Sequence, residues 1–97
     1  MTLEEFKKQV DGQDEPPPGM PDLLRALWYD RKGEWDRAHK IAQDVHESDG
    51  SWVHAYLHRR EGDLSNARYW YHRAGRSESK ATLEEEWEEI ARELLSR

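Results

Sequence analysis

Hydrophobic residues recur along this chain at intervals of three and four positions, which is the spacing of one face of an α-helix. The pattern predicts helices over residues 2–10, 21–32, 34–46, 52–61, 64–74 and 83–95. No segment alternates polar and apolar positions in the way that a half-buried β-strand does. The sequence therefore predicts an all-α fold.

Turn-forming residues mark the ends of these helices. Ser48-Asp49-Gly50 predicts a break, after which Ser51 is suited to cap the next helix. Three prolines at 16–18 predict a stiff extended connector, because proline fixes φ and excludes a helix. We therefore divide the chain into a short N-terminal helix with its connector, residues 1–20, and a helical domain, residues 21–97. Whether the first helix packs on that domain stays open.

Capping boxes are predicted at the two ends of the chain. Thr2 with Glu5, and Thr82 with Glu85, have the spacing at which each side chain bonds the other residue's backbone N–H. The second box begins a helix with a clear apolar stripe, and the glutamates at 84–86, 88 and 89 are predicted to face water. We expect this helix to cap the domain.

Composition decides whether the helices pack into a core. Charged residues make up 37% of the 97 residues, and the net charge is −6. Leu, Ile, Val and Phe together number only fifteen. Few aliphatic residues combined with high net charge are typical of disordered chains. Five Trp and four Tyr counter this, because their rings bury large areas. The net charge is −3 over residues 1–20, +1 over 21–76 and −4 over 77–97, and the middle part holds eight of the ten aromatic residues and all five histidines. We therefore expect a folded domain that recognises its partner through the middle part.

Several classes of protein are excluded by the same composition. Without cysteine there is no disulfide framework, thiolate metal site or cysteine nucleophile. No apolar run reaches the length of a membrane span, and the acidic start has no signal-peptide apolar region, so we expect a cytoplasmic protein that does not bind membranes. A sequence pI of about 5.3 without a basic tail argues against nucleic acid as a partner.

The middle part contains an internal repeat with an offset of 29 residues. Identical residues coincide at Ala26 and Ala55, Arg31 and Arg60, Gly33 and Gly62, and Ala38 and Ala67. Small residues thus fall where two helices would cross closely, and glycine falls at each turn between paired helices. The placement predicts two helical hairpins of the same design.

The segments 31–38 and 60–67 resemble the interhelical turn of the tetratricopeptide-repeat family, Gly-acid-aromatic-x-x-Ala. The resemblance covers about residues 21–76. It implies two tetratricopeptide-like antiparallel helical hairpins, with residues 83–95 as a C-terminal capping helix. It also implies a groove, lined by the first helix of each pair, that binds a partner.

Candidate partner-binding residues follow from this groove. They are Arg31, Trp52, Tyr56, Arg59 and Arg60, of which the last four share one helical stripe. Guanidinium groups beside aromatic rings suit a carboxylate, either a peptide C-terminus or an acidic side chain. The sequence thus predicts a small protein-interaction module that binds a peptide or an acidic partner.

Three other interpretations stay open. The rings can belong to the core, with the arginines solvated or paired to Asp30 and Glu61. Two short repeats can also need a second copy to cover their apolar faces, which would make the protein a structural homodimer. The third interpretation is a small metal-dependent or otherwise uncharacterised enzyme, because His54 and His58 have the i, i+4 spacing at which two imidazoles can hold a metal ion. With no third ligand or catalytic motif in sequence, we predict no catalytic residue, no cofactor and no metal.

Overall fold

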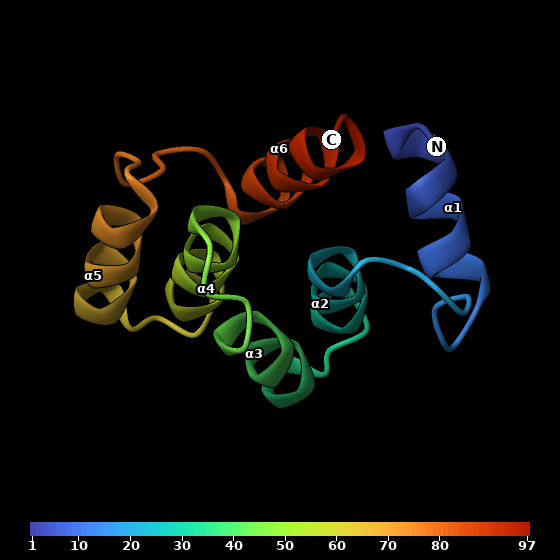
Figure 1. Cartoon of the computed structure of the whole chain (residues 1–97), viewed down its shortest axis with the longest axis horizontal. Coiled ribbons are helices and arrows are strands. Elements are labelled where there is room, and N and C mark those ends of the chain that lie inside the picture. Colours follow the sequence, from blue (N-terminus) through green and yellow to red (C-terminus); the bar gives the residue numbers. More distant parts are fainter.

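The protein is described by a computed structural model that covers all 97 residues. It contains six α-helices and no β-strand (Figure 1). The helices are α1 (Leu3–Gly12), α2 (Asp22–Arg31), α3 (Trp35–Gln43), α4 (Ser48–Arg60), α5 (Leu64–Ala74) and α6 (Leu83–Leu95). The predicted all-α fold is confirmed.

Both predicted capping boxes are present. At the start of α1, the Glu5 N–H donates to Thr2 Oγ1 at 3.1 Å, and the Glu5 carboxylate accepts from the Thr2 N–H at 2.8 Å. Thr82 and Glu85 make the same two bonds at the start of α6, at 3.0 and 2.9 Å. Each box satisfies backbone donors that a helix start leaves free, so local sequence defines where these two helices begin.

The turns that join α2 to α3 and α4 to α5 have the same backbone geometry, 29 residues apart. Gly33 and Gly62 both adopt left-handed φ values, 83° and 88°, which glycine reaches without steric cost. The N–H groups of Glu34 and Asp63 each donate to the carbonyl five residues earlier, at 2.8 and 2.9 Å. The repeat seen in the sequence is therefore present in these two turns.

Helices α2, α3 and α4 each pack against the helix that follows, and the two terminal helices complete the molecule (Figure 1). The last helix, α6, contacts both α2 and α4, and α1 packs on α6. Met1 and Leu95 line the same surface hollow, so the two ends of the chain lie at one edge of the molecule.

Aromatic rings fill the centre of a single core cluster. Trp28, Tyr56, Trp87 and Phe6 are among the most buried side chains. The Phe6 ring stacks on Trp87 with ring centroids 5.6 Å apart and meets Trp28 edge-on at 6.4 Å. Because Phe6 belongs to α1, the first helix is part of the same core as the rest of the chain.

The predicted break at residues 48–50 is wrong. These residues form the first turn of α4, and Glu47 occupies the N-cap position that the sequence had assigned to Ser51. Gly50 is required there for space, because a Cβ atom at this position would overlap the carbonyl oxygen of Val45. The glycine therefore allows α4 to begin in close contact with the loop that follows α3.

We expect Gly50→Ala to lower the free energy of unfolding by about 1–3 kcal/mol or more, because the added methyl group meets backbone that cannot rotate away. Urea denaturation measures the change. Gly12→Ala is the matched control, since this helical glycine has no atom within 4 Å of the Cβ position and alanine favours the helix. Equal stability of the two variants would contradict the close packing at Gly50.

Candidate functional site

The five residues predicted to bind a partner all lie close to α6. They form two groups, each beside one buried carboxylate: Arg31, Tyr56 and Arg60 line a hollow that contains Asp30, whereas Trp52 and Arg59 contact Glu86. Asp30 and Glu86 are each 1% exposed. The structure therefore divides the predicted site between two places.

Asp30 is the centre of the first group. The Tyr56 hydroxyl donates to Asp30 Oδ2 at 3.0 Å, and Arg60 Nε forms an ion pair with Oδ1 at 3.2 Å. Burial raises the pKa of the Asp30 carboxyl, and Arg60 opposes this increase. Arg31 lies in the same hollow of about 310 Å³ and binds both carboxylate oxygens of Glu84, at 3.0 and 3.1 Å. Arg31 and Arg60 thus lie near each other, as the repeat predicts, but each has an acidic partner in the chain.

Glu86 is the centre of the second group. Its carboxylate accepts hydrogen bonds from Arg59 at 2.8 Å, from the Tyr71 hydroxyl at 2.6 and 2.8 Å, and from the Trp52 indole at 3.3 Å. Arg59 also donates to the carbonyl of Ala81. Burial and the adjacent carboxylate raise the pKa of Tyr71, which keeps its hydroxyl protonated as a donor. These bonds hold α6 against α4 and α5.

The expected exposure of the two aromatic site residues is corrected by the structure. Trp52 is 3% exposed and Tyr56 is 1% exposed, so both rings are part of the core. The reason is the position of α6, which packs against α2 and α4 and covers the face that the groove hypothesis left open. The interpretation in which these rings belong to the core and arginines pair with acids describes this geometry better, although Arg60 pairs with Asp30 and not with Glu61.

We expect Arg59→Met to destabilise the fold by about 3–5 kcal/mol, because it leaves the Glu86 charge buried without its cation. Thermal and urea denaturation measure this. The matched control is Arg68→Met, which removes an exposed ion pair with Glu78 that contributes less than about 1 kcal/mol. If the two variants were equally stable, the buried pair would not hold α6 in place.

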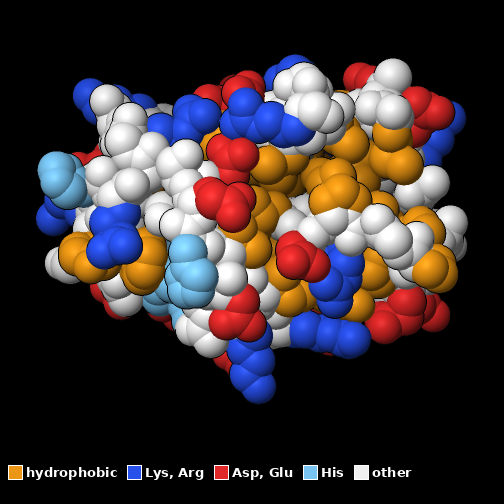
Figure 2. Space-filling model, in the orientation of Figure 1, with side chains coloured by type: hydrophobic (Ala, Val, Ile, Leu, Met, Phe, Trp, Pro, Cys, Tyr) orange, Lys and Arg blue, Asp and Glu red, His pale blue; other side chains and the backbone are white.

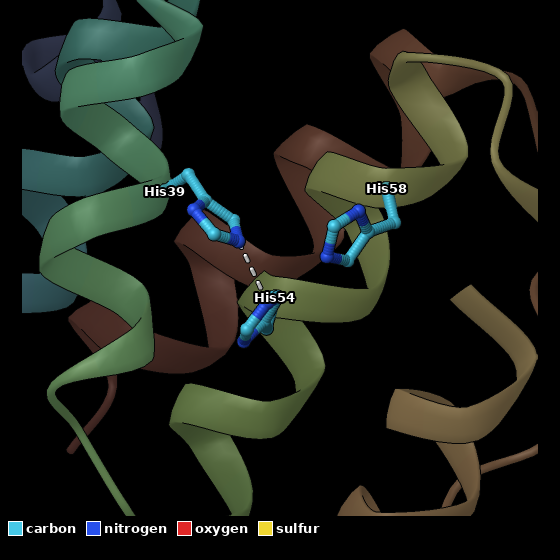
Figure 3. Close-up of side chains that lie close together, drawn as sticks. All are labelled: His39, His54 and His58. Atoms are coloured by element: carbon cyan, nitrogen blue, oxygen red, sulfur yellow. Dashed lines mark hydrogen bonds between the residues drawn. The ribbon is translucent and has the colours of Figure 1, made fainter. Parts of the chain in front are cut away.

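A cluster of three histidines lies between α3 and α4 (Figure 3). His39 comes from α3, and His54 and His58 come from successive turns of α4. Their ring centroids are 4.6 to 5.1 Å apart, and the Nε2 atoms of His39 and His54 lie 2.9 Å apart in a hydrogen bond. The i, i+4 spacing in the sequence predicts His54 and His58 as a pair, whereas the structure adds His39, which the spacing does not indicate.

Aromatic and acidic side chains fix the orientation of these rings. Trp35 stacks on His39 with centroids 4.8 Å apart, and Trp70 stacks on His54 at 3.9 Å. His58 Nδ1 lies 2.8 Å from a carboxylate oxygen of Glu61. His54 and His58 are 5% and 6% exposed, whereas His39 is half-buried at the surface.

The environment of the cluster disfavours protonation. Burial, together with neighbouring His39 and His58, lowers the pKa of His54 to about 4. Burial also lowers the pKa of His39; His58 adds to this effect, and Glu61 and Asp36 oppose it. These two rings are therefore neutral near pH 7 and offer nitrogen lone pairs.

We expect the metal-free protein to lose stability as the pH falls from about 6.5 to 4. In this window His39 and His54 bind more protons in the unfolded chain, where histidine titrates near pH 6.5, because their pKa values are lowered in the folded protein. The contribution of His54 reaches at most about 3 kcal/mol. Urea midpoints measured in EDTA across this range should decrease less steeply in His54→Asn. The control His72→Asn, which changes an exposed histidine, should follow the wild type. If the wild type, His54→Asn and His72→Asn lost stability in parallel as the pH falls, the lowered pKa of His54 would be contradicted.

A third feature is an apolar hollow of about 500 Å³ between the start of α2, the α3–α4 loop and the end of α6. Its apolar lining comes from Pro21, Leu23, Leu24, Val45 and Leu94. A smaller hollow of about 290 Å³ shares Pro21 and Leu24 with it and continues along the proline-rich connector. We call the two together the apolar groove. Figure 2 shows hydrophobic side chains gathered over this part of the molecule, with charged side chains around them.

Comparisons with known proteins give no match for this chain. No family model, curated protein or solved structure matches it. None of its helices has the length and apolar character needed to cross a bilayer. The candidate functional features of the chain are the two buried carboxylate groups, the histidine cluster and the apolar groove.

Proposed function

We propose that this chain is a small protein-interaction module whose apolar groove binds a segment of a partner protein. The observation that supports this proposal is the groove itself, which continues from the start of α2 to the N-terminal methionine. Apolar concave surface of this kind is typical of binding sites. The tetratricopeptide-like family and the cytoplasmic location stay predictions, and both agree with such a role.

Charges at the rim of the groove favour a basic partner. Asp44 and Glu47 line it without an ion-pair partner in the chain, and Asp22 pairs only with Arg25 of its own helix, at 3.0 Å. Arg97, the one Lys or Arg of the larger hollow, is paired with Asp49 and Glu93. The partner segment should therefore carry apolar side chains flanked by Lys or Arg, because complementary charge favours encounter and register.

The alternative in which Arg31, Arg59 and Arg60 bind a partner's carboxylate stays a prediction. Each guanidinium is paired with an acid of this chain, so such a partner would have to displace Glu84, Glu86 or Asp30. The groove requires no such exchange. It therefore supports partner binding more directly, and no step of the proposal requires catalysis.

We expect a fluorescent amphipathic peptide of Leu and Lys to bind saturably, and a Leu and Glu peptide of the same pattern to bind far more weakly. Leu94→Asp, which places a charge in the groove, should weaken binding of the Leu and Lys peptide at least about tenfold, or 1.4 kcal/mol. Asp44→Lys should weaken it by removing complementary charge. Fluorescence anisotropy measures each affinity.

Leu64→Asp is the matched control, because Leu64 is an apolar side chain on α5 that is 55% exposed and lies outside the groove. It should leave the affinity unchanged; an equal loss in both variants would show that the peptide binds nonspecifically. Light scattering tests the second candidate, a homodimer. The proposal would be overturned if the wild type were a dimer that binds no peptide and if Leu94→Asp converted this dimer to a monomer. The groove would then be the interface of self-association.

A further inference from the structure

We propose that His39, His54 and His58 form a binding site for one divalent transition-metal ion, with Zn²⁺ as its representative occupant. The site lies between α3 and α4, apart from the apolar groove, and is independent of the function proposed above. Two of its ligands share one face of α4, and the third comes from the facing surface of α3 (Figure 3).

The positions of the ring nitrogens fit a single ion. One nitrogen of each histidine lies within 4.8 Å of the nitrogens of the other two. Two nitrogens bound to tetrahedral Zn²⁺ at 2.0–2.1 Å are about 3.3 Å apart. The 2.9 Å between Nε2 of His39 and Nε2 of His54 is slightly shorter than this, so a small movement of the rings admits the ion. The hydrogen bond between these two nitrogens is exchanged for two metal bonds.

The surroundings of the site match those of metal-binding histidines. Such histidines usually donate the second ring nitrogen to a carboxylate or carbonyl, which fixes the tautomer and the ring orientation. Glu61 provides this contact to Nδ1 of His58, which leaves Nε2 as the ligand atom. Trp35 and Trp70 stack on His39 and His54 and limit the rotation of these rings.

The donor set selects the class of ion. Three imidazoles without thiolate suit Zn²⁺, Cu²⁺, Ni²⁺ or Co²⁺, whereas Ca²⁺ and Mg²⁺ require oxygen ligands. Three protein ligands leave a fourth position for water or another ligand, as in open zinc sites. The half-buried His39 connects the cluster to the surface and gives the ion a route of entry. The carboxylates of Glu61 and Asp63 lie beside His58 and partly offset the charge of the ion.

Titration of the EDTA-treated, desalted protein with Zn²⁺ tests the proposal. Isothermal calorimetry at pH 7.5 should show one ion per chain with micromolar or tighter affinity, and bound ion should raise the melting temperature by mass action. Co²⁺ in place of Zn²⁺ should give the strong visible absorption of a four-coordinate site. His54→Asn should weaken binding at least about a hundredfold, since it removes one of three ligands.

Matched variants separate the site from nonspecific binding by histidine. His46→Asn and His72→Asn change exposed histidines outside the cluster and should bind Zn²⁺ as the wild type does. Glu61→Gln should weaken binding about 10–100-fold, because it loosens His58 without removing a ligand. If the buried His54 substitution prevents folding, His39→Gln at the surface takes its place.

Absence of saturable one-to-one binding in the folded wild type would overturn the proposal. So would an equal loss of affinity in His72→Asn and in the cluster variants, because the ion would then bind at the surface. Binding that survives His39→Gln unchanged would reduce the site to the two histidines of α4 and contradict the role of α3.

Discussion

Two consecutive residues of α6, Glu86 and Trp87, connect this helix to four of the other five. The Glu86 carboxylate accepts hydrogen bonds from two side chains of α4 and from Tyr71 of α5. The Trp87 indole donates to the carbonyl of Leu27 in α2 at 3.1 Å, and its ring stacks on Phe6 of α1. Neighbouring positions on a helix point in different directions, so one turn of α6 can bind both halves of the molecule. The rings of Trp52, Tyr71 and Phe6 all contact this turn.

The aromatic core explains why a small domain contains buried acids. Indole N–H and phenol O–H groups need acceptors when they are buried, whereas aliphatic side chains do not. Trp52 and Tyr56 find these acceptors in Glu86 and Asp30, and Trp35 donates to a main-chain carbonyl of α4 at 2.7 Å. With few aliphatic residues, the chain fills its core with rings, and it satisfies some of their donors with main-chain carbonyls and others with buried carboxylates. Arginines next to those carboxylates balance the charge, which is why they are not free for a partner.

Most features fixed by neighbours in sequence were predictable, with the start of α4 at Ser48 as the exception, and those fixed by distant contacts were not. The capping boxes at both ends depend on residues three positions apart, and both are present. The position of α6 over α2 and α4 depends on the buried bonds of Glu86. In the sequence, Glu86 is one of five glutamates between residues 84 and 89 and looks like another surface residue. The histidine cluster was half predictable: the spacing of His54 and His58 marks one face of α4. His39 joins them only because α3 packs on that face, and one signal for this was the Trp35–His39 pair at the same i, i+4 spacing.

The histidine cluster is not something that the repeated architecture requires. The turns after α2 and α4 share one geometry at an offset of 29 residues, yet the positions equivalent to the three histidines hold other residues. His54 corresponds to Arg25, His58 to Tyr29 and His39 to Arg68. Buried polar rings lose solvation that an apolar side chain of similar size would not lose, so helix packing alone favours other residues here. The two turns form whether these positions hold the three histidines or Arg68, Arg25 and Tyr29, and the cluster joins His39 of the first helix pair to His54 and His58 of the second. The repeated turn therefore does not account for this convergence of imidazoles, which agrees with the metal site proposed above.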